Sequence, residues 1–224
     1  MKILSITILL VMLFFSKKQE SPKPISYIAF GDSYTICTGT SNTNEHWPNI
    51  LTKHLTALGI ATELTANPSR NGFTTQNLIV SEFPLLKSTT IDFATLLIGV
   101  NDWVRQVDIE TYHKNLNYSI DEIQKKLSNK KHLLLITIPD FGVTPQGKLY
   151  GSDRDISKGI TEFNNIIKSE AKKRGLVCVD IFTISQQMKN NKELVAADGL
   201  HPSAKEYAIW ETLIFPEAKK LLSK

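Results

Sequence analysis

Cysteine is scarce in this sequence. The two cysteines, Cys37 and Cys178, lie far apart and form no C-x-x-C pair. The sequence therefore offers neither a cysteine-based zinc site nor a disulfide framework. We expect two buried free thiols, and a Cys37–Cys178 bridge stays open for a chain that reaches an oxidising compartment.

A strong excess of one charge is also missing, as are the residues that mark disordered or fibrous chains. The 26 basic and 22 acidic residues give a formal net charge of +4, too small and too scattered for a nucleic-acid groove. Only 11 glycines and 9 prolines occur, and 42% of the residues are hydrophobic, as in a globular chain with a real core. At roughly 100 to 200 residues per domain, the 224 residues predict one sizeable domain.

The amino terminus carries an apolar run that is too short for a membrane span. Residues 3–15 make 13 residues, whereas a spanning helix needs about 20. The run follows Met1 and Lys2, an arrangement typical of a signal peptide. A buried first strand is the alternative.

The stretch 16–24 is polar and contains proline, which favours a tether over a strand. No A-x-A cleavage site follows the apolar run, and Ser16, Lys17 and Lys18 stand where a lipoprotein signal would carry its acylated cysteine. We therefore interpret residues 1–24 as a signal-like segment with a tether, and residues 25–224 as the folded domain. The segment predicts export to the periplasm or the extracellular space, with cleavage and a membrane tether both open.

From residue 27 onward, short apolar runs alternate with longer stretches of helical period. The predicted strands are 27–30, 62–66, 93–98, 132–138 and 177–180, and the predicted helices are 47–58, 75–83, 109–127, 156–174 and 203–222. This alternation indicates an α/β protein with one doubly wound, mostly parallel, five-stranded sheet.

Polar residues and glycines gather just after the predicted strands, where an open parallel sheet binds its ligand. The segments are Gly31-Asp32-Ser33, 67–72, Gly99-Val100-Asn101-Asp102 and, near the end of the chain, Asp198-Gly199-Leu200-His201-Pro202. Together they predict one site at the carboxyl edge of the sheet.

Three of these residues supply the groups for acyl transfer by serine, which needs a base and a third group to orient that base. Ser33, His201 and Asp198 are of those types, and the three-residue spacing lets the Asp198 carboxylate reach imidazole Nδ1. Gly31 permits a tight turn that would leave Ser33 exposed at a helix amino terminus. Asp180, at the end of the last strand, is the alternative orienting carboxylate.

Ester hydrolysis also needs donors that face the developing oxyanion. The candidates are the Ser33 N–H, the Gly72 N–H and the Asn101 side-chain amide, because all three follow strands at the same edge. Asp102 is expected to cap a helix or fix a loop.

Gly31-Asp32-Ser33, Gly72, Gly99-x-Asn101-Asp102 and Asp198-x-x-His201-Pro202 resemble, in order, the four sequence blocks of the SGNH/GDSL hydrolase family. The resemblance covers residues 25–215. It implies a three-layer α/β/α sandwich, a Ser33–His201–Asp198 triad, and an oxyanion hole of Ser33, Gly72 and Asn101. It also implies a carboxylic ester hydrolase that forms an acyl-Ser33 intermediate and needs neither metal nor cofactor.

The expected partner is a small-molecule ester, of an esterase or lysophospholipase type, with no nucleic acid. The alternatives are a carbohydrate O-acetylesterase of the same family and a non-catalytic module that binds a glycan or a nucleotide. Cys37 departs from the small residue that many relatives have shortly after the nucleophile, and this leaves the shape of the pocket there open.

The segment 140–153 is expected to form a rim loop over the pocket, with Phe141 and Tyr150 as linings. Within it, 142–148 nearly completes a phosphate-binding G-x-x-x-x-G-K-[ST] motif, but Leu149 stands at the hydroxyl position and Pro145 lacks an N–H. His46 is a further candidate for the pocket. His54, His113 and His132 are expected on the surface.

Overall fold

The computed structural model describes residues 23–86 and 90–223. Five strands form one sheet in the order β2-β1-β3-β4-β5, and every neighbouring pair is parallel. The strands are β1 (Ile25–Gly31), β2 (Thr62–Ala66), β3 (Phe93–Leu97), β4 (Leu133–Ile136) and β5 (Val177–Val179). The sheet is thus wholly parallel, where the sequence predicted a mostly parallel one. This strand order is that of the doubly wound flavodoxin-like folds.

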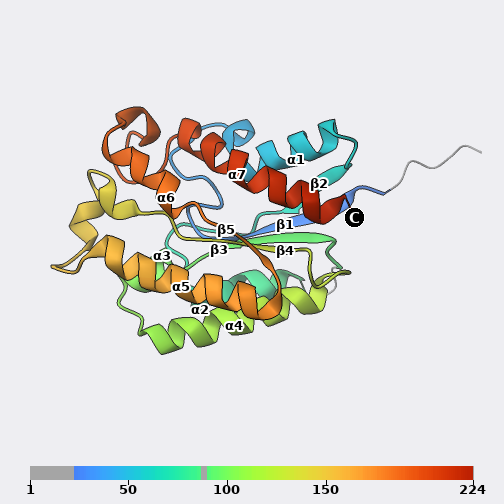
Figure 1. Cartoon of the computed structure of the whole chain (residues 1–224), viewed down its shortest axis with the longest axis horizontal. Helices are drawn as coiled ribbons and strands as arrows, with labels where there is room; N and C mark the ends of the chain where they lie inside the picture. The colour runs from blue at the N-terminus through green and yellow to red at the C-terminus, as the bar shows by residue number, and fades with distance from the viewer. Residues whose placement is uncertain (1–22, 87–89, 224) are drawn as a thin grey trace, which may run out of the picture.

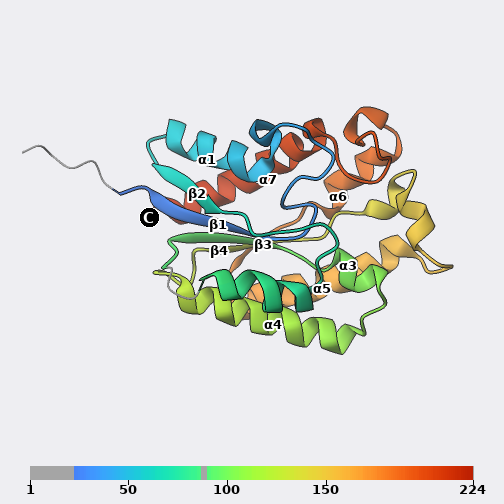
Figure 2. The same cartoon turned by 180° about the vertical axis from the view of Figure 1, so that it is seen from behind.

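Helices cover both faces of the sheet, which gives the expected three layers (Figure 1). On one face lie α1 (Trp47–Ala57), α6 (Phe182–Ser185) and α7 (Ala204–Leu222). On the other lie α2 (Thr75–Asn77), α3 (Val100–Val104), α4 (Ile109–Lys126) and α5 (Ile156–Arg174), as the reverse view in Figure 2 also shows. The long helices are capped locally: Asp108 accepts the Thr111 N–H, Asp155 accepts the Lys158 N–H, and Ser203 accepts the Glu206 N–H.

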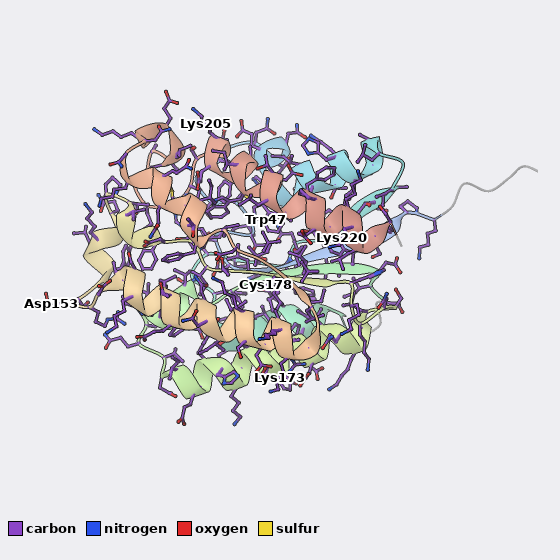
Figure 3. All side chains as sticks on the ribbon, viewed as in Figure 1. Trp47, Asp153, Lys173, Cys178, Lys205 and Lys220 are labelled. Atoms are coloured by element: carbon purple, nitrogen blue, oxygen red, sulfur yellow. The ribbon has the colours of Figure 1, made fainter. Side chains whose placement is uncertain are left out.

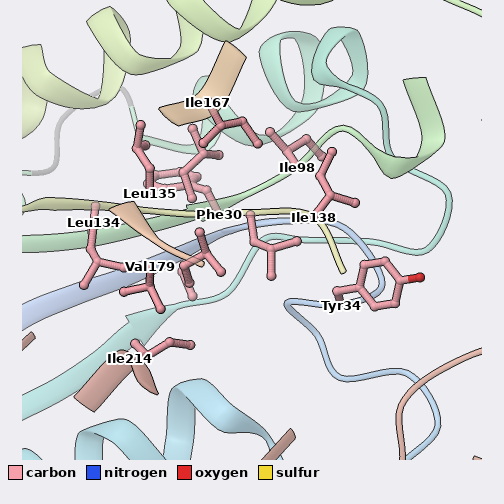
Figure 4. Close-up of a cluster of buried hydrophobic side chains, with 14 of the residues drawn as sticks. Phe30, Tyr34, Ile98, Leu134, Leu135, Ile138, Ile167, Val179 and Ile214 are labelled. Atoms are coloured by element: carbon pink, nitrogen blue, oxygen red, sulfur yellow. The ribbon is translucent and has the colours of Figure 1, made fainter. Parts of the chain in front are cut away.

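The core lies between these layers because the central strands are apolar on both faces. All five residues of β3 are buried, as a strand in the middle of a parallel sheet requires. Figure 4 shows Phe30, Leu135 and Ile167 in this core, from β1, β4 and α5. Charged side chains such as Lys205 and Asp153 extend outward instead (Figure 3).

The main difference from the expected elements lies at residues 75–83, which were predicted as one helix. The structure has only α2 there, followed by a π-helical turn (Leu78–Glu82) and a 3₁₀ turn (Phe83–Leu86). The wider π turn interrupts the α-helical hydrogen-bonding pattern, and Glu82 within it is 1% exposed. The short helices α3 and α6 were not predicted, because so few residues show no periodicity.

The predicted signal-like segment and tether cover residues 1–24, of which 1–22 lie outside the described residues. Within the described part of the chain, no helix has the length and apolar character of a membrane span.

Gly159 lets α5 pack closely against α3, and substitution of this glycine tests the contact. A Cβ at position 159 would overlap the indole nitrogen of Trp103. Gly159→Ala should therefore lower the free energy of unfolding by about 1–3 kcal/mol, the usual cost of overpacking, although alanine favours helices. Thermal denaturation measures the change. Ser169→Ala, at an exposed position of the same helix, is the control and should not destabilise. Stabilisation by both substitutions would contradict the close contact.

Candidate active site

A pocket of about 230 Å³ opens at the carboxyl edge of the sheet. Its lining residues are Ser33, Tyr34, Asn71, Gly72, Val100, Asn101, Val104, Phe141, Tyr150, Leu200 and His201. Four of the five residues predicted for the triad and the oxyanion hole are in this set, and the fifth, Asp198, binds His201. The structure therefore brings all five together, as the strand-end pattern predicted.

Ser33 follows β1 in a tight turn. A Cβ on Gly31 would overlap the Leu97 carbonyl oxygen and Thr35 Oγ1, so only glycine fits where the turn folds over the end of β3. The prediction of a helix after Ser33 was wrong: residues 33–39 form successive turns, in which the Thr38 N–H donates to the Ser33 carbonyl over 2.9 Å. Cys37, with φ of 60°, is incompatible with a continuing helix. Ser33 is only 6% exposed, and the pocket reaches it.

The turn that carries Ser33 packs directly against the loop that carries His201. At Gly39 a Cβ would lie 2.7 Å from the Pro202 carbonyl oxygen and 3.2 Å from His201 Cβ. This contact joins two segments far apart in the sequence and fixes the distance between their loops.

His201 and Asp198 form the expected pair. Asp198 Oδ2 lies 2.6 Å from His201 Nδ1, and Oδ1 accepts the N–H groups of Leu200 and His201, each over 2.9 Å. Burial acts to raise the pKa of Asp198, but these hydrogen bonds outweigh it and hold that pKa below its ordinary value. Asp198 is therefore an ionised acceptor for the Nδ1–H of His201. No hydrogen bond is recorded in the described chain for the other ring nitrogen, Nε2.

The alternative carboxylate, Asp180, has other partners. Its Oδ1 accepts the Thr137 hydroxyl over 3.0 Å, and its Oδ2 lies 2.6 Å from Lys168 Nζ. Burial again acts to raise its pKa, and the Lys168, Phe182 and Thr137 interactions lower it below its ordinary value. The geometry therefore assigns Asp180 to the α5–β5 contact and not to His201.

The two segments that carry Gly72 and Asn101 are bound to each other. Asn101 Nδ2 donates to the Phe73 carbonyl over 2.9 Å, and Arg105 donates to the Gly72 carbonyl over 2.8 Å. Asp102 accepts both the N–H and the hydroxyl of Thr75, over 2.8 and 2.5 Å, as the loop-fixing role predicted. Arg105 was missed by the sequence reasoning, since nothing in its spacing connects it to a glycine 33 positions away.

Arg154 connects the predicted rim loop to α3. Arg154 lies over the Trp103 ring, 3.8 Å from its centroid, and donates to the Trp103 carbonyl over 2.9 Å. This ties residues 141–154 to α3, and Phe141 and Tyr150 line the pocket as predicted. His46 does not line it but directly precedes α1, as the N-cap residue of that helix. The segment 142–148, which nearly matches a phosphate-binding motif, includes short 3₁₀ turns, and Leu149 next to it is exposed.

Two carboxyl groups lie buried behind the Ser33 turn. Burial raises the pKa of Asp32 to about 8, and the Asp102 carboxylate adds to the rise. Burial likewise raises the pKa of Glu82 to about 8; the nearby Gly31 N–H opposes the rise, and the Asp32 carboxylate adds to it. Asp32 Oδ2 and both Glu82 carboxyl oxygens are enclosed without a hydrogen-bond partner in the described chain. Both groups are therefore largely protonated in the folded protein at neutral pH.

The cysteines are free thiols, as expected. Cys37 is buried, whereas Cys178 is only half-buried, although both were expected to be buried. Burial raises the pKa of Cys37 well above its ordinary value, so its thiolate is disfavoured. Among the described residues, no group of three or more His, Cys, Asp or Glu side chains is arranged to hold a metal ion.

The arrangement is that of an α/β protein with a pocket at the strand ends. The model of the GDSL-like lipase/acylhydrolase family matches residues 29–209. The chain belongs to this family. No curated protein matches the sequence.

Solved structures share the fold. A lipase/acylhydrolase from Enterococcus faecalis is 23% identical, with a TM-score of 0.68, over 88% of this chain and 96% of its own. A lipolytic G-D-S-L family member from Veillonella parvula is 20% identical, with a TM-score of 0.67, over 86% and 97%. An acetylxylan esterase from Geobacillus stearothermophilus is 16% identical, with a TM-score of 0.65, over 87% and 94%.

The buried carboxyl groups predict a pH dependence of stability. A folded-state pKa near 8 lies above the value in the unfolded chain, so stability is full at low pH and falls as the pH rises toward 8. Glu82→Gln should remove the part of this loss of stability that ionisation of Glu82 causes. The melting temperature of the variant, relative to wild type, should therefore rise steadily between pH 5 and pH 8.

Thermal denaturation across that range checks this expectation. Glu63→Gln, at an exposed position of β2, is the matched control and should follow the wild-type curve. Parallel curves for Glu82→Gln and wild type would show that Glu82 is already ionised in the folded protein.

Proposed function

We propose that this protein is a serine hydrolase that cleaves carboxylic esters through an acyl-Ser33 intermediate. The observation that carries the proposal is that Ser33 and an aspartate-bonded His201 line one pocket. A serine hydroxyl alone is a weak nucleophile, and this arrangement supplies the base that activates it.

In this mechanism His201 Nε2 takes the proton of the Ser33 hydroxyl as the serine attacks the ester carbonyl. Asp198 accepts the Nδ1–H over 2.6 Å, which fixes the tautomer and stabilises the imidazolium. His201 then protonates the leaving alcohol. Water, activated by the same base, hydrolyses the acyl-enzyme.

The oxyanion is held by the Ser33 N–H, the Gly72 N–H and the Asn101 amide. One amide hydrogen of Asn101 is directed to the Phe73 carbonyl, which orients the side chain and leaves the second hydrogen for the substrate. Such preorganised donors are worth about 10²–10³ in turnover each.

The pocket favours a small acyl group. Its volume of about 230 Å³ lies below the roughly 300–1,000 Å³ that is usual for sites of drug-sized ligands. This observation supports a second candidate within the same chemistry, an O-acetylesterase acting on a carbohydrate. The solved acetylxylan esterase of the same fold is consistent with it.

Covalent labelling tests the proposal. A fluorophosphonate should modify Ser33 in the folded wild-type protein and fail to modify Ser33→Ala, because only an activated serine attacks the phosphorus centre. Mass spectrometry of the labelled peptide identifies the residue. Ester turnover of Ser33→Ala should fall to about a thousandth of wild type or less, with the melting temperature kept. Absence of labelling would instead favour a non-catalytic binding module.

The same substitution, aspartate to asparagine, at Asp198 and at Asp180 tests which carboxylate serves His201. Asp198→Asn should lower kcat by about 10⁴-fold, because asparagine cannot stabilise the imidazolium. Asp180→Asn should leave kcat nearly unchanged and lower the melting temperature, since it breaks the contacts with Lys168 and Thr137. Steady-state kinetics and thermal denaturation of both variants check the order. The reverse order would assign Asp180 to the histidine.

A further inference from the structure

Tyr34 follows Ser33 directly, and packing fixes its ring beside His201. Its N–H donates to Asp32 Oδ1 over 3.0 Å, and its carbonyl accepts the Trp47 indole N–H over 2.9 Å. The ring meets His201 edge-on, with centroids 6.0 Å apart, and Trp210 edge-on at 5.9 Å. The direction of the phenol is therefore set from both sides.

The hydroxyl of this ring has no protein partner in the described chain, unlike those of the other buried tyrosines. Those hydroxyls pair as Tyr27 with Thr95 (2.8 Å), Tyr207 with the Thr38 carbonyl (2.9 Å) and Tyr112 with the Ile98 carbonyl (3.5 Å). Tyr34 lines the pocket, and its hydroxyl is not among the polar atoms sealed from solvent. Figure 4 shows its ring pointing away from the aliphatic core. Because buried tyrosine hydroxyls normally find a partner, the partner is expected inside the pocket.

The hydroxyl acts as a donor. Burial raises the pKa of Tyr34 well above its ordinary value, and the Asp32, Asp198 and Asp140 carboxyl groups act in the same direction. The phenol therefore stays protonated at neutral and mildly alkaline pH.

The position of the ring decides which half of the ester the hydroxyl meets. The ring contacts His201, the group that protonates the leaving alcohol in the proposed mechanism. The alcohol half of the substrate must therefore lie against His201, on the side of the pocket that Tyr34 occupies. Of the three proposed oxyanion donors, Gly72 and Asn101 are carried by other loops, and only the Ser33 N–H belongs to the turn that carries Tyr34.

We propose that the Tyr34 hydroxyl donates a hydrogen bond to an oxygen atom in the alcohol half of the substrate. The natural ester is then one of a sugar or another polyol, not of a simple alkyl alcohol. This inference rests on the proposed ester hydrolysis and adds to it the chemical class of the alcohol.

Two isosteric substrates test the hydrogen bond. In 2-methoxyethyl acetate an ether oxygen replaces one methylene of butyl acetate, and the acyl group is the same. Wild type should hydrolyse the methoxyethyl ester with the higher kcat/KM. Tyr34→Phe should lower kcat/KM for that ester about five- to tenfold, the usual value of one neutral hydrogen bond, and leave butyl acetate unchanged.

Tyr118→Phe is the matched control, because it removes a hydroxyl from an exposed phenol of α4 that does not line the pocket, and it should keep the wild-type ratio of the two esters. The melting temperature of Tyr34→Phe should equal that of wild type, since no protein hydrogen bond is lost. An unchanged ratio, or an equal loss on both esters with a lower melting temperature, would overturn the role of Tyr34 alone. If wild type cleaved neither ester and the fluorophosphonate left Ser33 unmodified, ester hydrolysis itself would be refuted, and this inference with it.

Discussion

The parallel pairing of β1 with β3 is the constraint on which the site depends. The register sets Gly31 opposite Leu97, so both strands end at the same level, and the chain must turn away from each at the same edge. The first turn carries Ser33, and the second leads into α3 with Asn101. The absence of a side chain at Gly31 lets the first turn fold over the end of β3. Two polar groups of one pocket are thus brought together by backbone pairing before any side chain contributes.

Several acidic groups lie near this edge of the sheet, and their surroundings shift their pKa values in different directions. Asp198 is held ionised by backbone N–H groups and the imidazole, whereas burial favours the neutral forms of Asp32 and Glu82. Asp198, which binds His201, is thus held in its charged form beside the pocket. The neutral forms of Asp32 and Glu82 keep negative charge away from the turn that carries Ser33.

Short-range patterns in the sequence predicted much of this arrangement. The bounds of α5 and β2 were predicted as the structure has them, because long amphipathic periodicity and a strand flanked by turn residues are local signals. The Asp198–His201 contact was also predictable, since one turn of chain joins the two residues. The helix expected after Ser33 was wrong, because a contact with the distant Pro202 loop governs Gly39 and the path of that turn. Arg105, Arg154 and the free hydroxyl of Tyr34 depend on tertiary neighbours and leave no trace in spacing.

The clamp of Arg154 on Trp103 has a consequence for how such a pocket can change over evolution. In the proposed mechanism Asn101 holds the oxyanion, and the same short helix carries Trp103, to which Arg154 attaches the rim, two residues further on. The pocket wall and this donor therefore belong to one mechanical unit. A substitution that widened the wall by displacing this helix would also move the donor. In the proposed mechanism, selectivity and rate are therefore coupled on this side, and a change of acyl preference that leaves the donor in place is expected at Leu200, which lines the pocket from a loop outside α3 and residues 141–154.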